Sequence, residues 1–343
     1  MERFQLGCIG NISMANLKNT TIDDTGFLEL PSGTTAQRPS NPQAGMIRWN
    51  TDDGAAEVYN GAEWGPLAEL PISAEGGTES EITVGGQNYR VHTFTSTGTS
   101  TFTVNSTGSS DGEVEYLIVA GGGGGGMGGG GAGGLLTGTI NVNAQSYSII
   151  VGDGGNKTTN TREFRGTDGE NSSAFGQTSI GGGGGGAYGD EGVAVRTGSS
   201  GGSGGGGGGL YTDQTNTAGG SGTPGQGNDG GSSESEVNGT AGGGGGAGSA
   251  GLDGEPGTGG DGISSSISGT STIYSGGGGG GSVFGPPGQG GSGGGADGGR
   301  YDPFLQADDA QVNTGGGGGG GTSTDFQNAG NGGSGIVIIR YKI

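Results

Sequence analysis

Few side chains in this 343-residue sequence could do acid–base or nucleophilic chemistry. His92 is the single histidine and Cys8 the single cysteine. A zinc site needs more His and Cys ligands than these. His92 is also the one candidate base for a Ser-His-Asp triad or a Cys-His pair, and it stands beside Phe94 in an alternating, strand-like segment. We therefore expect a structural role for His92, no enzyme activity, no metal site and no cofactor.

Carboxylates and glycines could in principle supply other chemistry. Asp190/Glu191 and Asp308/Asp309 are adjacent pairs in polar segments, where solvated surface charge is favoured over a glycosidase-like pair. Gly-x-Gly-x-x-Gly occurs many times through composition alone, and no phosphate-binding Gly-x-x-x-x-Gly-Lys-Ser/Thr motif is present. Residues 259–263 resemble one calcium-binding repeat but lack its nine-residue tandem. No nucleotide or calcium site is predicted.

The candidate binding residues are aromatic side chains between glycine-rich stretches. Tyrosine and phenylalanine are frequent anchors at binding surfaces. The alternative is that these rings cap the ends of a scaffold, and the residues alone leave both interpretations open. The candidates are Tyr188, Tyr211, Tyr274, Phe284, Tyr301 and Phe304.

Glycine runs are the elements that must position those aromatics. Glycine accounts for 98 residues. Flexible linkers are one interpretation. Against it, the runs lack alternating serine, recur at short intervals, and are bracketed by the strand-like segments 116–120 and 335–341. The runs begin at Gly121, Gly181, Gly204, Gly242, Gly276 and Gly315.

The ordered interpretation is a bundle of polyglycine-II helices, which have three residues per turn and no internal hydrogen bonds. Their outward N–H and C=O groups must be paired by neighbouring helices. A Cβ pointing into such a bundle would push the helices apart, so interior helices need glycine throughout. Met127 and Ala132 interrupt glycine stretches, and we expect their side chains to point outward.

Composition limits the partners. The net charge is −21, which argues against a nucleic-acid partner. Hydrophobic residues are only 27%, too few for an apolar core throughout the chain. No stretch approaches the length of a membrane span, and the N-terminus does not look like a secretory signal. We expect a protein made in a cytoplasm, with no membrane insertion.

The predicted fold class is mainly β with non-regular structure and almost no α-helix. Strands are predicted at 27–30, 46–50, 56–59, 88–95, 101–104, 114–120, 135–142 and 147–151. Trp49, Tyr59 and Trp64 are expected to form one aromatic cluster. The predicted organisation is an N-terminal attachment segment 1–26, a small β-hairpin module 27–67, a linker 68–81, a β-region 82–151, and a polyglycine-II bundle 152–343 closed by strand 335–342.

Two parts of the sequence resemble bacteriophage proteins. Residues 33–50 (GTTAQRPSNPQAGMIRWN) and 59–64 (YNGAEW) resemble a module of tail-fibre and other virion proteins, especially of phages of marine bacteria and cyanobacteria. Residues 92–95 (HTFT), 115–126 (EYLIVAGGGGGG) and 332–341 (GGSGIVIIRY) resemble a glycine-rich domain at the C-terminal end of such fibres. That domain is similar to the tip adhesins of T-even-like phages, whose polyglycine-II helices carry host-recognition loops.

The resemblance implies a virion tail fibre. Its N-terminal part would attach to a tail or baseplate protein and form a homotrimer. Its loops at Tyr188, Tyr211, Tyr274, Phe284 and 301–304 would bind a host cell-surface receptor, an outer-membrane protein or a polysaccharide. The alternative is a purely structural fibre spacer or collar protein without receptor binding.

Overall fold

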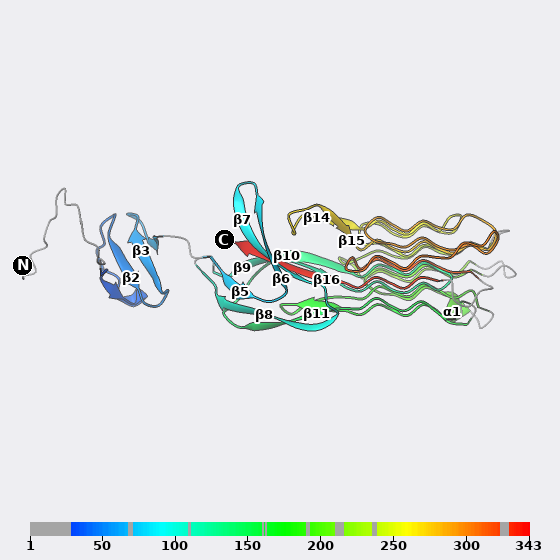
Figure 1. The fold of residues 1–343 in the computed structure, drawn as a ribbon, viewed down its shortest axis with the longest axis horizontal. Coiled ribbons are helices and arrows are strands. Elements are labelled where there is room, and N and C mark those ends of the chain that lie inside the picture. The colour runs from blue at the N-terminus through cyan, green and yellow to red at the C-terminus, as the bar shows by residue number, and fades with distance from the viewer. Residues whose placement is uncertain are drawn as a thin grey trace, which may run out of the picture. The chain divides into compact units, whose positions relative to one another are not determined.

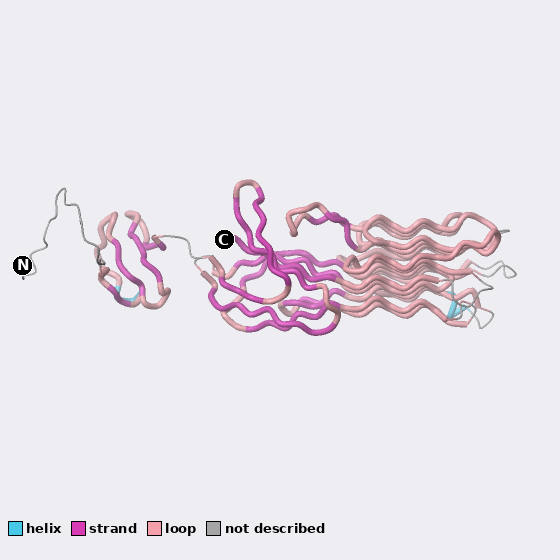
Figure 2. The backbone as a smooth tube through the Cα atoms, viewed as in Figure 1, coloured by secondary structure: helices cyan, strands magenta, loops and turns pink. Residues whose placement is uncertain are grey.

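The computed structural model describes residues 29–67, 71–108, 111–159, 161, 163–189, 193–209, 216–234, 239–322 and 329–343. The chain divides into two compact units, Met1–Ala68 and Glu69–Ile343. The predicted attachment segment 1–26 lies outside the described residues. Within them, helix is limited to one 3-10 turn, η1 (Thr35–Gln37), and one α-helical turn, α1 (Val193–Arg196) (Figure 2). The expectation of a mainly β chain is confirmed.

The first unit is a four-stranded sheet in the order β1-β2-β3-β4 (Figure 1). The predicted hairpin is present as β2 (Ile47–Asn50) and β3 (Ala55–Tyr59), which pair antiparallel. The predicted strand at 27–30 is not found at the described residues 29 and 30; β1 (Ser32–Gly33) starts later, and β4 (Trp64–Pro66) completes the sheet.

The expected aromatic cluster in this unit is only partly formed. The rings of Tyr59 and Trp64 lie 5.6 Å apart. Trp49 pairs with Ala56, whereas Tyr59 pairs with Trp64, an odd number of residues further along β3. Because side chains alternate between the two faces of a strand, Trp49 points to the opposite face, where it is 42% exposed.

The second unit contains two five-stranded sheets. One has the order β10-β9-β16-β7-β6, and the other β13-β12-β11-β8-β5. The segment 68–81, expected to be a linker, carries β5 and the start of β6, because its polar residues face solvent on edge strands. The strands are β5 (Ser73–Glu75), β6 (Thr78–Val84), β7 (Gln87–Phe94), β8 (Gly98–Ser106), β9 (Glu113–Val119), β10 (Leu135–Asn141), β11 (Ser146–Val151), β12 (Ser172–Ala174), β13 (Gln177–Ser179) and β16 (Ile336–Lys342).

The two sheets share an apolar core, and the last strand of the chain lies within it. Phe102 and Ile149 from one sheet pack with Ile118 and Ile339 from the other, all fully buried. β16 pairs antiparallel with both β9 and β7. The predicted closing strand 335–342 is confirmed, and it fastens the end of the chain into the centre of a sheet. A separate hairpin, β14 (Ile263–Ser265) and β15 (Thr272–Tyr274), completes the unit.

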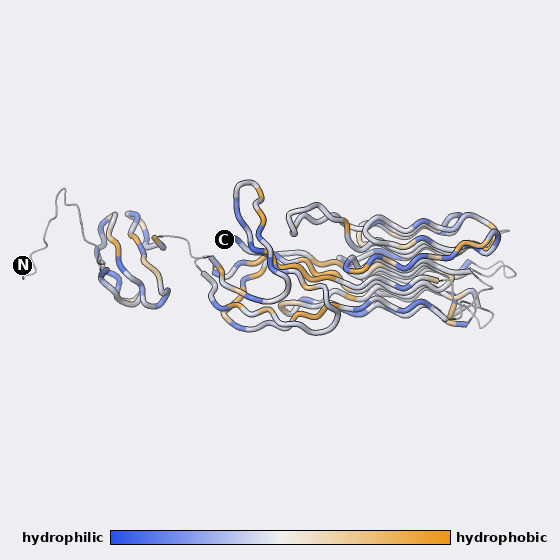
Figure 3. The backbone as a smooth tube through the Cα atoms, viewed as in Figure 1, coloured by the Kyte–Doolittle hydropathy of each residue, from blue (hydrophilic) through white to orange (hydrophobic). Residues whose placement is uncertain are grey.

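Between these strands the chain repeatedly leaves the sheets and returns in extended segments that lie side by side (Figures 1 and 2). We call the segments between residues 120 and 335 that do so the glycine bundle. Figure 3 shows that apolar colour is concentrated in the strands, while the bundle is mostly near neutral. The bundle starts at run 121–126, directly after β9, and not at residue 152 as expected. Its first run lies in its interior.

Hydrogen bonds from run 121–126 repeat every three residues. Its amides donate in rotation to three segments, and its carbonyl oxygens accept in rotation from three others. The amides of residues 121 and 124 donate to segment 167–170, those of 122 and 125 donate to segment 330–333, and those of 123 and 126 donate to segment 128–131. The carbonyl oxygens of the run accept hydrogen bonds from segments 155–158, 182–185 and 318–321. A β-strand, in contrast, has partners on two sides. The run therefore lies among six neighbours and pairs its backbone groups without side chains.

The close approach of these segments explains the glycine content. A Cβ on any residue of run 121–126 would lie well inside 3.0 Å of a backbone carbonyl group. The same holds in the middle of other runs, at Gly205, Gly244, Gly278 and Gly318. None of these residues has a positive φ. Glycine is needed here for its missing Cβ and not for its freedom in φ.

The expectation that Met127 and Ala132 point outward is wrong. Both are fully buried. Met127 forms the turn between runs 121–126 and 128–131 and packs with Ala241 and Val283 in a small apolar cluster. A side chain fits there because the runs separate at their ends, where the chain turns.

Candidate functional site

The glycine bundle has two different ends. β9, β11 and β16 join it at the end that carries the sheets, which we call the proximal end. Run 278–281 pairs antiparallel with 127–130. Gly281 therefore lies beside the Met127 turn, at the end of the bundle away from the sheets. The loops at that level form the distal end, where α1 lies (Figure 1). We call them the distal loops: the described residues of 159–165, 188–196, 254–256, 283–287 and 300–306.

Two distal loops bring three of the predicted aromatics together. Phe284 is 48% exposed, Tyr301 41% and Phe304 59%. The amide of Tyr301 donates to Ser282 O at 3.1 Å, and that of Asp302 donates to Val283 O at 3.2 Å. These bonds join the base of loop 283–287 to that of loop 300–306.

The second of these loops is itself a closed turn. Arg300 and Leu305 exchange two backbone hydrogen bonds, each 2.8 Å long. Arg300 Nε also donates to Pro303 O at 3.2 Å. The backbone beneath Tyr301 and Phe304 is thus held by its own hydrogen bonds, so these exposed rings do not have to organise the loop.

Tyr188 fits both interpretations of the aromatic residues, as binding residues and as caps of the bundle. It is half-buried and packs against the cluster of Met127, Ala241 and Val283 at the distal end. Its amide donates to Thr161 O at 2.6 Å, which links two distal loops. Part of its ring therefore caps the bundle.

Tyr274 was predicted on an exposed loop, and this is wrong. Its side chain is 5% exposed and packs with Leu117, Val119 and Ile338 against a sheet at the proximal end. Burial raises the pKa of its hydroxyl. Tyr274 belongs to β15, whose alternating side chains cover the sheet. Tyr211 lies outside the described residues.

Sequence reasoning missed Phe164, which is 58% exposed in a distal loop. The neighbouring Arg165 donates from Nη1 to Thr197 O at 3.3 Å, which connects this loop to the segment after α1. The sequence did contain a signal, because Arg162-Glu163-Phe164-Arg165 interrupts the glycine-rich pattern as the other aromatic loops do. No long glycine run borders these residues, so the aromatic is less conspicuous than the other candidates. Leu305, 48% exposed, adds an apolar side chain beside Phe304.

Carboxylates along the bundle have a structural use. Segments at its periphery have amides that no further segment can pair. Asp168 Oδ1 accepts from Gly184 N at 2.8 Å, Asp229 Oδ1 from Gly222 N at 2.8 Å, and Asp297 Oδ1 from Gly290 N at 2.7 Å. Hydrogen bonds from the hydroxyl and the amide of Ser292 lower the pKa of Asp261. An acidic side chain suits these positions because an ionised carboxylate only accepts hydrogen bonds.

One of the carboxylate pairs singled out in the sequence, Asp308/Asp309, also accepts hydrogen bonds from backbone amides of the bundle. Asp309 Oδ1 accepts from Asn331 N at 2.7 Å, and Asp308 continues the hydrogen-bonded backbone of its segment. Asp190 and Glu191 lie outside the described residues. Over the described ranges, no group of three or more His, Cys, Asp and Glu could hold a metal ion, and no helix there is long and apolar enough to cross a membrane.

His92 lies away from the distal loops, inside the core between the sheets. It is fully buried, with Nδ1 2.8 Å from Gly76 O and Nε2 3.0 Å from Tyr341 Oη. Burial lowers its pKa. Both ring nitrogens are occupied by structural contacts, as expected for a structural histidine.

Comparison with known proteins gives a family assignment for most of the second unit. The family of the glycine-rich domain matches residues 94–342, and the chain belongs to that family. The match runs from the last residue of β7 to the end of β16, so it includes the glycine bundle and most strands of the two sheets but not β5 and β6. A comparison with curated proteins finds no match.

Proposed function

We propose that this chain is a virion fibre protein of a tailed bacteriophage, and that its distal loops bind the host cell surface. The observation that carries the proposal is the collection of exposed aromatic side chains at one end of a scaffold built largely of glycine. Phe284, Tyr301 and Phe304 share two hydrogen-bonded loops there, and Phe164 lies on a third. The resemblance of residues 33–50 and 59–64 to modules of phage tail-fibre proteins supports the assignment to a virion fibre.

We further propose that the extended segments of the glycine bundle are polyglycine-II helices. The three-residue rotation of hydrogen bonds from run 121–126 supports this, because such a helix has three residues per turn. The arrangement suits adhesion. A scaffold held by backbone groups leaves its connecting loops free to vary in sequence without disturbing the fold.

The proposed mechanism is binding without catalysis. Exposed aromatic rings offer large contact area at a low cost in side-chain entropy. The partner would be an outer-membrane protein or a polysaccharide of the host. The first unit would attach the fibre to a tail or baseplate protein, and a trimer would present several distal ends at once. Simultaneous binding then raises the avidity above the affinity of one site.

Binding of the labelled full chain to whole cells tests the proposal. The cells would be a panel of marine bacteria and cyanobacteria, followed by flow cytometry. We expect binding to at least one strain, and at least a tenfold loss of binding in the triple variant Phe284→Ala, Tyr301→Ala, Phe304→Ala. The matched control is Val312→Ala, an apolar residue that is 65% exposed near the proximal end.

Two results would contradict the adhesin. The chain could bind no strain, or the triple variant could bind as well as the parent. Either result, with an intact fold, leaves a structural fibre spacer or collar protein as the function to pursue.

A further inference from the structure

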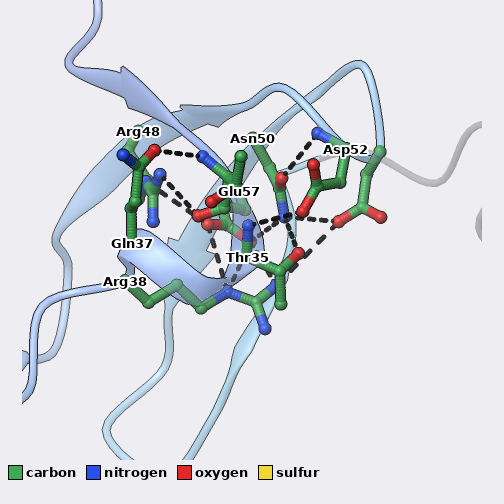
Figure 4. A network of polar contacts seen from close by, with 9 residues as sticks. Thr35, Gln37, Arg38, Arg48, Asn50, Asp52 and Glu57 are labelled. Carbon is green, nitrogen blue, oxygen red and sulfur yellow. Dashed lines mark hydrogen bonds and ion pairs between the residues drawn. The ribbon is translucent and has the colours of Figure 1, made fainter.

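The N-terminal sheet carries polar side chains on its covered face. Arg48 is 5% exposed, Asn50 is not exposed and Glu57 is 3% exposed. Figure 4 shows them beneath the segment that contains η1. Arg38 donates to Glu57 from Nε and Nη2, Arg48 Nε lies 3.5 Å from Glu57 Oε1, and Asn50 Nδ2 donates to Thr35 Oγ1 at 2.9 Å. A network of charged and polar side chains thus occupies the covered face, where an apolar core would usually lie.

The opposite face of the same sheet is apolar and partly exposed. Side chains alternate along a strand, so the residues between the buried polar ones point outward. The pairing aligns Ile47 with Val58 and Gly65, and Trp49 with Ala56. Leu67 continues the second row, because its amide donates to Ala56 O at 2.7 Å. We call these residues the outer face: Ile47, Trp49, Ala56, Val58, Gly65 and Leu67.

This distribution leaves the unit short of apolar burial. Among residues 29–67, the only buried hydrophobic side chain is Ala55. Ile47 is 40% exposed, Trp49 42% and Leu67 52%. Burial of apolar surface is the main source of folding free energy, and a small unit has little to spare. A partner that covers the outer face would supply burial that the unit does not obtain from the side chains described.

Charge favours a second copy of the chain as that partner. Two chains that each carry a net charge of −21 repel each other over most of their surfaces. The outer face has no charged side chain, while Asp52 and Asp53 lie at the β2–β3 turn and Glu57 on the covered face. Two outer faces can therefore meet without placing like charges in contact.

Shape favours the same partner. Trp49 stands beside the small side chain of Ala56, and a Cβ added at Gly65 would meet nothing within 4 Å. Large and small residues share one surface, so the outer faces of several copies can pack together around a symmetry axis. We propose that the outer face is where the N-terminal unit packs against another copy of this chain. The inference rests on the proposed fibre only for the expectation of an oligomer.

Sedimentation velocity of the full chain over a concentration series tests the inference. We expect the parent chain to self-associate, and Trp49→Glu and Leu67→Glu each to lower the association constant at least tenfold, because a charge would be buried unpaired. Val312→Glu, which places a charge at an exposed apolar residue of the second unit, should associate like the parent.

Charge reversal distinguishes a second copy from any other occupant. Trp49→Glu chains mixed with Trp49→Lys chains should associate more tightly than either variant alone, since the opposite charges then meet across the interface. Hydrogen exchange of the β2 and β3 amides checks the fold. If Trp49→Glu unfolds the sheet, Leu67→Glu carries the test, because Leu67 lies one residue beyond the end of β4, at the margin of the sheet.

Three outcomes would overturn the inference: a monomeric parent chain, variants that associate like the parent, or mixing without effect. None of these measurements involves cells. A chain that self-associates but binds no host strain would therefore contradict the adhesin and leave the outer face intact as an interface.

Discussion

His92 Nε2 lies 3.0 Å from the hydroxyl oxygen of Tyr341, which connects two residues 249 positions apart in the chain. The two rings also stack, with centroids 5.5 Å apart. Gly76 O can only accept a hydrogen bond, so His92 Nδ1 carries the proton and Nε2 accepts from the Tyr341 hydroxyl. This contact joins β7 to the closing strand β16, and it requires a neutral imidazole.

Acidification should therefore weaken the fold. Burial lowers the pKa of folded His92 below its unfolded value of about 6.5, so stability from this residue is complete above that pH and is lost as the pH falls below it. The slope is at most about 1.4 kcal/mol per pH unit. Glu79, whose Oε1 lies 3.9 Å from Nδ1, opposes the shift, and Arg90 adds to it.

Urea unfolding at pH 7.5, 6.5 and 5.5 would measure this loss. The matched variant is His92→Gln, which should be less stable at pH 7.5 but should lose less stability between 6.5 and 5.5. If the parent and His92→Gln have the same pH dependence over that interval, carboxylates and not His92 cause it.

A methyl group in the first glycine run should disrupt the bundle. The Cβ of Gly123→Ala would overlap the carbonyl group of Gly183, and backbone on all sides prevents relaxation. We expect the free energy of unfolding to fall by about 3 kcal/mol or more. Gly209→Ala is the control, because the nearest atom to its Cβ would be 3.3 Å away. Thermal unfolding of both variants tests the prediction, and equal melting temperatures would contradict it.

Peripheral carboxylates should be replaceable by amides but not by methyl groups. Asp297→Ala removes the acceptor for the Gly290 amide, and we expect a loss of about 0.5–1 kcal/mol. Asp297→Asn keeps an oxygen at that position and should lose less. Chemical unfolding at neutral pH compares the two. A larger loss for the amide would mean that the negative charge matters more than the hydrogen bond.

The distal end should separate residues that hold the fold from residues that are free to bind. Met127 is fully buried between the ends of the runs, so Met127→Ala should cost about 2–3 kcal/mol. The exposed Phe304 should tolerate alanine within about 0.5 kcal/mol. Melting temperatures give the comparison. Strong destabilisation by Phe304→Ala would show that this ring caps the bundle.

The sequence by itself determined the local elements. Alternation at 88–95 and the apolar segments before Gly121 and after Gly335 predicted β7, β9 and β16, because strand-forming patterns are properties of short segments. Because glycine has no side chain to pack, only backbone hydrogen bonds could order the glycine runs. That reasoning predicted that glycine segments pair through their backbone groups, but not which segments pair with one another.

Only the tertiary structure decided which segments become neighbours and which side chains are covered. Run 121–126 lies among six segments scattered from residue 128 to 333, and no local pattern specifies those partners. Met127 is buried because runs end together at a turn, and Tyr274 because a hairpin folds over a sheet. The polar residues of β5 and the start of β6 form edge strands because β8 and β7, from later in the chain, pair with them. Burial depends on what packs against a residue, and that is set by chain segments far away in the sequence.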